Sequence, residues 1–133
     1  MARLILDTGV LIGAVRGKLD LGSWPASDEL AVPAVAVAEY LAGVLQDHDP
    51  GRTAAQRDFL ERALAVLPVI DYTEEVAAVH AALLAHTRRT GQKRGPHDLM
   101  IAASAVASKR ELVTTDAHAR FDELPDVKSR LVA

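Results

Sequence analysis

The chain has 133 residues, of which half are hydrophobic and a quarter are charged, and its formal net charge is -3. A chain of this size has room for one hydrophobic core but not for two, so we expect residues 1–133 to form a single domain. The absence of cysteine excludes disulfide frameworks, thiolate nucleophiles and cysteine-based zinc sites, and the mild negative charge argues against a protein that coats nucleic acid through bulk positive charge.

Neither a membrane span nor a secretion signal is visible in the sequence. No stretch approaches the roughly 18 to 20 uncharged apolar residues that a membrane span needs. The N-terminus lacks the basic, then apolar, then small-residue pattern of a secretion signal. We therefore expect a cytoplasmic protein.

Short apolar runs alternate along the chain with longer segments of helical spacing. The brief, sharply bounded runs predict strands, and apolar residues three and four apart predict helices. The expected strands are residues 3–7, 30–32, 69–70, 112–115 and 127–132, and the expected helices are residues 8–16, 34–46, 53–67, 73–90, 96–109 and 118–124, with turns over 17–28. This alternation is typical of an α/β domain in which a parallel sheet of about five strands is sandwiched between helices.

Two acidic residues stand where predicted strands end. Asp7 closes the first strand, and Asp116 closes the strand LVTTD. In such folds ligands bind beyond the carboxyl ends of the strands, near a topological switch point. We expect both acids at that edge of the sheet.

Two further acids lie in apolar helical segments. Glu39 lies inside VPAVAVAEYLAGVL, whose neighbours offer no cationic partner, and Asp98 lies in the first turn of HDLMIAASAVA. None of the four acids stands at an obviously exposed position. A carboxylate in apolar surroundings costs free energy unless a cation meets it.

Four carboxylates gathered at one end of a sheet would repel one another, so such a cluster calls for a cation. An all-oxygen site suits Mg²⁺ or Mn²⁺. In nucleases these ions activate a water for attack on a phosphate, so the pattern indicates phosphodiester hydrolysis.

Each acid taken singly also has a structural explanation. Asp98 would interact favourably with a helix dipole, and Asp116 would cap the helix that follows it. Glu39 gains nothing from capping, because it lies in the middle of its helix. Only the joint placement of the four acids favours a metal site.

Four segments, LILDTGVLI, VAEYLAG, HDLMIAASA and LVTTDAHARF, resemble in order and spacing the motifs of PIN-domain ribonucleases, especially the VapC toxins of toxin-antitoxin pairs. The resemblance covers essentially the whole chain and implies a parallel sheet between helices. The residues that match the family's catalytic and metal-binding acids are Asp7, Glu39, Asp98 and Asp116, and those that match its supporting hydroxyl residues are Thr8 and Thr114. The resemblance also implies a homodimer that cleaves transfer RNA or another structured RNA and is inhibited by a co-expressed antitoxin.

One position departs from the family pattern. Many relatives carry a further acid or asparagine shortly after the last acid, whereas His118 stands two residues beyond Asp116 here. We expect a second metal to bind more weakly for this reason. His118 itself is either a metal ligand or, more commonly for a lone histidine near a helix start, a surface or capping residue.

A basic segment precedes the third motif. The stretch HTRRTGQKRGPH contains no acid, and its cations are Arg88, Arg89, Lys93 and Arg94. These residues are candidates for binding RNA phosphates. The alternative is a solvated helix end whose basic residues favour the helix dipole.

Other functional classes fit less well. A phosphoacceptor signalling domain needs adjacent acids after the first strand, and an aspartyl phosphatase needs a second aspartate at the position of Gly9. A DNA-binding antitoxin would show a basic helix-turn-helix or ribbon segment, which is missing. The main alternative is a non-catalytic PIN-fold module for RNA binding or protein interaction, which predicts the loss of at least one of the four acids.

Overall fold

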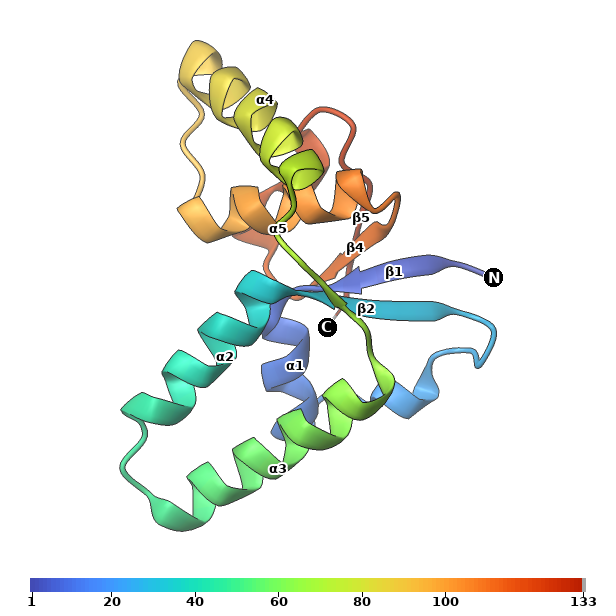
Figure 1. Ribbon diagram of the computed structural model, residues 1–133, viewed down its shortest axis with the longest axis vertical. Coiled ribbons are helices and arrows are strands. Elements are labelled where there is room, and N and C mark those ends of the chain that lie inside the picture. The colour runs from blue at the N-terminus through green and yellow to red at the C-terminus, as the bar shows by residue number, and fades with distance from the viewer. Residues whose placement is uncertain (133) are drawn as a thin grey trace.

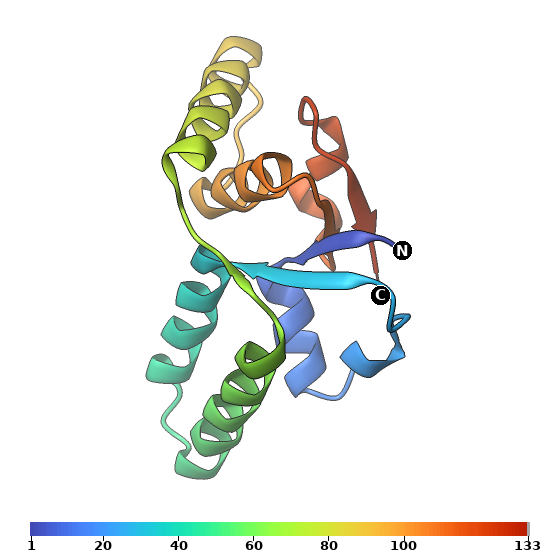
Figure 2. The same ribbon diagram turned by 45° about the vertical axis from the view of Figure 1, so that its right-hand side comes forward.

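The computed structural model describes residues 1–132 and shows an all-parallel sheet with helices on both faces (Figure 1, Figure 2). Its five strands lie in the order β3-β2-β1-β4-β5. The strands are β1 (Arg3–Leu6), β2 (Glu29–Pro33), β3 (Val69–Ile70), β4 (Glu111–Thr114) and β5 (Ser129–Leu131). The helices are α1 (Thr8–Val15), α2 (Ala34–Gln46), α3 (Pro50–Val66), α4 (Glu74–Thr90) and α5 (Pro96–Ala107), with short 3-10 turns at Leu21–Ser23, Ala117–Ala119 and Phe121–Glu123. The α/β class and the parallel sheet predicted from the sequence are confirmed.

The central strand β1 is buried on both of its faces. Leu4 and Leu6 pack into a core with α1, α2 and α3, and Ile5 packs into a second core with α4 and α5. Figure 1 shows these two groups of helices on opposite sides of the sheet. Successive side chains of a strand point to opposite faces, so a strand covered on both faces is a continuous apolar run.

The topological switch point lies between β1 and β4. From β1 the chain moves outward to β2 and β3, and it then crosses to add β4 and β5 on the other side. Leu6 pairs with Val113, and the Asp7 N–H donates a hydrogen bond to the Val113 carbonyl at 2.9 Å. The residues that follow β1 and β4 therefore lie side by side at the carboxyl edge of the sheet.

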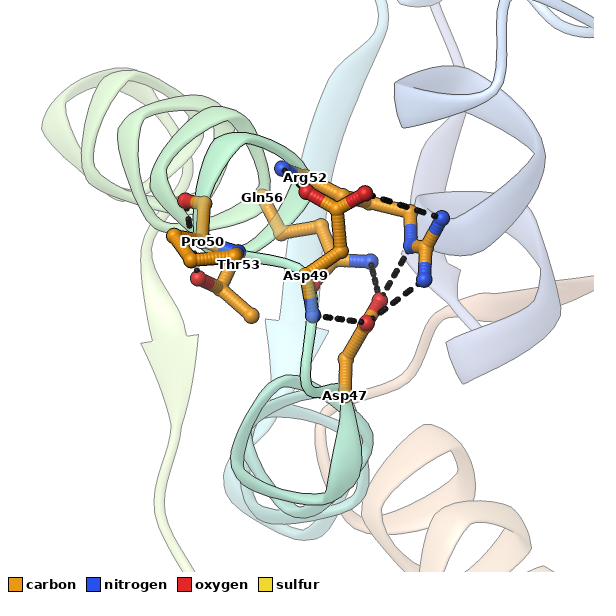
Figure 3. Close-up of polar contacts among 6 residues, drawn as sticks. All are labelled: Asp47, Asp49, Pro50, Arg52, Thr53 and Gln56. Atoms are coloured by element: carbon orange, nitrogen blue, oxygen red, sulfur yellow. Dashed lines mark hydrogen bonds and ion pairs between the residues drawn. The ribbon is translucent and has the colours of Figure 1, made fainter.

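An ion-pair cluster fixes the turn between α2 and α3 (Figure 3). The Asp47 carboxylate accepts hydrogen bonds from the Arg52 guanidinium, from Gln56 Nε2 at 3.3 Å and from the Asp49 N–H at 3.0 Å. Asp49 in turn caps α3 by accepting the Arg52 N–H at 3.0 Å. The cluster joins the end of α2 to the start of α3.

We expect Arg52→Ala to lower the melting temperature by a few degrees, and by less at high salt, because the ion pair is partly exposed. Arg52 and the neighbouring donors lower the pKa of Asp47 below its ordinary value of 3.8. The stabilisation is therefore present above pH 3.8 and is lost as the pH falls through the lower pKa of the folded state. Thermal unfolding of Arg52→Ala and of the control Arg57→Ala, which removes the same charge from an exposed site on α3, measures the difference. Equal melting temperatures for the two variants would contradict this role.

Two predicted helix boundaries were wrong, and one predicted helix is not a continuous helix. Helix α3 begins at Pro50 rather than at residue 53, because Asp49 caps it and proline suits the first helical position. Helix α5 ends at Ala107 rather than at residue 109, because Lys109 adopts a positive φ of 56°. The helix expected at 118–124 is two 3-10 turns that meet at Arg120, whose φ is 48°. None of the helices among residues 1–132 combines the length and the apolar character that a bilayer crossing requires.

Candidate active site

Asp7 is the most buried acid at the carboxyl edge of the sheet, with 6% of its surface exposed. It is the N-cap of α1, and its Oδ1 accepts the Thr8 N–H at 2.7 Å. Its Oδ2 accepts the Thr114 hydroxyl at 2.7 Å. Burial raises the pKa of Asp7, the two hydrogen bonds oppose this, and the nearby charges of Glu39 and Asp116 raise it further.

Glu39 reaches the same edge from the middle of α2. Its Oε1 accepts the Thr8 hydroxyl at 2.6 Å, and its Oε2 lies 3.1 Å from His97 Nδ1. The helix of Glu39 offers it no cationic partner, as the sequence interpretation expected, but the first turn of α5 brings His97 against its carboxylate. Sequence reasoning missed this histidine, and its position beside Asp98 was the only signal that pointed to it.

Asp98 lies in the first turn of α5 and is partly buried. Burial raises its pKa to about 6, and the charges of Asp7, Asp116 and Glu39 add to this, while His97 opposes it. Among the contacts of residues 1–132, no hydrogen bond stabilises the Asp98 carboxylate. Its oxygens are therefore free to bind a ligand.

Asp116 follows β4 and is exposed, contrary to the expectation that all four acids avoid exposed positions. Its Oδ1 accepts the His118 N–H at 2.9 Å, so it caps the 3-10 turn that follows. Its own N–H donates to the Thr114 hydroxyl oxygen at 3.0 Å. Thr114 thus links Asp7 to Asp116, and the exposed His118 meets Asp116 through its backbone N–H.

The helix α1 starts close against the end of β4. A Cβ atom added at Gly9 would lie 2.3 Å from Thr115 Oγ1. A larger residue at this position would require the Thr115 side chain to turn away. The close approach keeps the N-terminus of α1, and with it Asp7 and Thr8, beside the residues that follow β4.

A hard divalent cation suits this set of groups, although the site is not a tight cage. In the part of the chain that the structure describes, no three acidic or imidazole side chains converge into a ready-made metal site. The four carboxylates nevertheless interact, because the charges of the other three all raise the pKa of Asp98. An all-oxygen donor set whose members repel one another fits Mg²⁺ or Mn²⁺, which keeps several waters and takes only one or two carboxylates directly.

A cavity of about 350 Å³ opens beside Asp116. Thr114, Arg120 and Ser129 also line it. It therefore adjoins the acidic edge on the side of β5 and offers one cation from Arg120.

The predicted basic residues lie on the end of α4 and on the loop before α5. Arg88, Arg89 and Lys93 are exposed. Arg94 is partly buried, and its guanidinium donates to the carbonyls of Gln92, Lys93 and Arg120 at 3.3 to 3.5 Å. Arg94 therefore ties its loop to the segment after Asp116, and the other three remain available to an anion.

Known proteins of similar sequence and similar structure exist for this chain. A family model described as the PIN domain matches residues 4–127. The chain is 25% identical over 125 residues to Ribonuclease VapC of Rickettsia bellii. The matched region covers 94% of this chain and 92% of that protein. A chain of the VapBC2 structure from Rickettsia felis, bound to a DNA fragment from their promoter, superposes with a TM-score of 0.88 at 21% identity and covers 98% of this chain and 99% of that one. A chain of VapBC-5 from Mycobacterium tuberculosis superposes with a TM-score of 0.82 at 27% identity, over 99% and 100% of the two chains.

Proposed function

Because this chain belongs to the PIN-domain family, we propose that it is a metal-dependent endoribonuclease and the toxin of a toxin-antitoxin pair. The relatives named Ribonuclease VapC match it over most of their length. The observation that supports the proposal is the electrostatic coupling of four carboxylates, since the charges of Asp7, Glu39 and Asp116 all raise the pKa of Asp98 near the switch point of the sheet. The binding-module alternative predicts a missing acid, and all four are present.

We assign the four acids to the metal-binding and catalytic site. Asp98 has a carboxylate without a hydrogen-bond donor among residues 1–132, so it is free to act as a ligand. Asp7 and Glu39 are each held by two donors, which fixes their orientation before any ligand arrives. Asp116, being exposed, meets solvent and substrate at the rim.

When bound, Mg²⁺ or Mn²⁺ would activate water and stabilise the charge that develops on the phosphate. The protein's part is to hold its carboxylates in place at an open edge where an RNA backbone has access. Thr8 and Thr114 act as supports, because each donates its hydroxyl to one of the acids. The exposed cations Arg88, Arg89 and Lys93 offer contacts to RNA phosphates, and recognition through the backbone fits a structured RNA such as a transfer RNA.

We also propose an antitoxin partner and a homodimer. The similar VapBC-5 structure from Mycobacterium tuberculosis is of a member of the VapBC family of toxin-antitoxin systems. An antitoxin that covers the carboxyl edge of the sheet would keep the RNA phosphates away from the four carboxylates.

Removal of metal tests the proposed activity. We expect purified protein, freed of antitoxin, to cleave total cellular RNA into discrete fragments with Mg²⁺ or Mn²⁺, to stop when EDTA is added, and to resume when metal is supplied in excess. Circular dichroism in EDTA serves as the control that the fold persists. Cleavage that continues in EDTA would contradict a metal-dependent mechanism, and a folded protein that binds RNA without cutting it would support the binding-module alternative.

A further inference from the structure

Both oxygens of the Glu39 carboxylate meet a donor from another helix. Thr8, in the first turn of α1, donates its hydroxyl to Oε1 at 2.6 Å, and His97, in the first turn of α5, lies with Nδ1 3.1 Å from Oε2. A carboxylate is only an acceptor, so the His97 Nδ1 atom carries a proton and donates it to Glu39. The contact joins helices that lie on opposite faces of the sheet (Figure 1).

We propose that His97 is a positioning residue, which holds Glu39 in the orientation that the metal site requires through a hydrogen bond from Nδ1 to Oε2. This inference rests on the proposed function, because it assigns Glu39 to that site. In this scheme His97 acts through its hydrogen bond to Glu39 and is not itself a metal ligand.

Glu39 needs such support more than Asp7 or Asp116 does. Those two are N-caps whose carboxylates accept a backbone N–H from a residue one or two positions further along the chain. Glu39 has a longer side chain, lies in the middle of α2, and has no backbone donor of this kind. Its side chain is 31% exposed, so solvent would compete for the carboxylate if one donor were lost.

Partners of metal-binding side chains have measurable effects. Loss of a group that hydrogen-bonds to a ligand costs about 10- to 100-fold in metal affinity or activity. An exposed ion pair without such a role contributes little. The His97 side chain is 58% exposed, so these two cases give clearly different results on substitution.

Three substitutions separate the hydrogen bond from the ring. His97→Ala removes the donor. His97→Asn keeps an N–H donor at the position of Nδ1, and His97→Gln moves the amide one bond further out, toward the position of Nε2. His48→Ala is the matched control, since His48 is exposed in the loop between α2 and α3.

Two measurements follow each variant: Mn²⁺ affinity by calorimetry without RNA, and the Mn²⁺ concentration that gives half-maximal cleavage. We expect His97→Ala and His97→Gln to lower the Mn²⁺ affinity by about 10-fold and to raise the Mn²⁺ concentration for half-maximal cleavage by about the same factor. Cleavage should largely recover at saturating Mn²⁺. We expect His97→Asn to restore most of the affinity, and His48→Ala to match the wild type. If the wild type cleaves RNA and His97→Ala binds Mn²⁺ with the same affinity as the wild type, the proposal is overturned. If His97→Asn is as impaired as His97→Ala, the imidazole acts by some other contact, such as one to RNA, and the proposal is likewise overturned.

A third measurement needs neither metal nor RNA. Nitrogen-15 NMR of the neutral His97 ring should show the proton on Nδ1 in the metal-free protein, and Glu39→Ala should shift it toward Nε2. An Nε2-protonated ring in the wild type would overturn the proposal. This result decides the contact even if the wild type proves not to cleave RNA, so failure of this inference and failure of the proposed function are distinguished.

Discussion

We expect Asp98→Asn to abolish RNA cleavage and, at the same time, to raise the stability of the metal-free protein at neutral pH. Cleavage should fall by more than about 100-fold. Loss of a residue that only hydrogen-bonds to a metal ligand costs up to that much, and Asp98→Asn removes the charge of a ligand itself. Stability should rise because burial and the three neighbouring acids raise the pKa of Asp98 to about 6. The ionised carboxylate is thus a cost to the folded state, and the amide is free of it.

The pH dependence has a definite sign. Since the folded state binds the Asp98 proton more tightly than the unfolded state, stability due to this group is fully present below the ordinary pKa of 3.8 and is lost as the pH rises through about 6. Asp98 is partly exposed, so after allowance for solvent screening we expect a gain of about 1 kcal/mol for Asp98→Asn above pH 6. Below pH 3.8 the two proteins should be equally stable.

Added metal should reverse the order of stabilities. Mn²⁺ binds only the folded wild type and stabilises it by mass action, and Asp98→Asn should respond weakly. Thermal unfolding as a function of pH, with EDTA or with Mn²⁺, measures the change in stability. RNA cleavage by the same proteins measures the loss of activity. Asp71→Asn, which removes an exposed charge before α4, should leave activity and stability unchanged. A folded Asp98→Asn protein with full activity at matched Mn²⁺ would remove Asp98 from the site.

The sequence was sufficient for the sheet because burial on both faces leaves a strong signal. Leu4 to Leu6 form a continuous apolar run, and the structure buries all three. Helix α2 was predicted with the bounds Ala34–Gln46, since Pro33 and the turn residues after Gln46 mark its ends. Where the local signal was ambiguous the prediction failed: Pro50 and Gly51 favour a turn by composition, and the cap from Asp49 lets them begin a helix instead.

The acids could be placed from the sequence, but their contacts could not. Asp7 and Asp116 follow from the rule that ligands gather at strand ends. The contact of Glu39 with His97 spans 58 positions of the chain, and it depends on how α2 and α5 cross, which periodicity does not reveal. The left-handed backbone at Arg120, which divides the last predicted helix, likewise has no glycine or asparagine to announce it.

Asp7→Asn should also abolish cleavage, for a reason that can be separated from folding. The amide keeps the shape of the carboxylate and still accepts the Thr8 N–H, but its nitrogen takes the place of Oδ2, which accepts the Thr114 hydroxyl at 2.7 Å. Thr114 can turn its hydroxyl and accept instead, so we expect a folded protein that has lost a ligand charge. Circular dichroism and RNA cleavage at fixed Mn²⁺ test the two halves of this expectation.

Thr114, which donates its hydroxyl to Asp7, can be tested in the same way. Thr114→Val removes the donor to Asp7 and the acceptor of the Asp116 N–H, so we expect a loss of about 10- to 100-fold in activity. Thr90→Val, which removes an exposed hydroxyl at the end of α4, should have little effect. Because Asp7 and Thr114 share a hydrogen bond, the double variant Asp7→Asn with Thr114→Val should lose no more Mn²⁺ affinity than Asp7→Asn alone. Additive losses in that cycle would mean that Thr114 serves catalysis through Asp116 rather than through Asp7.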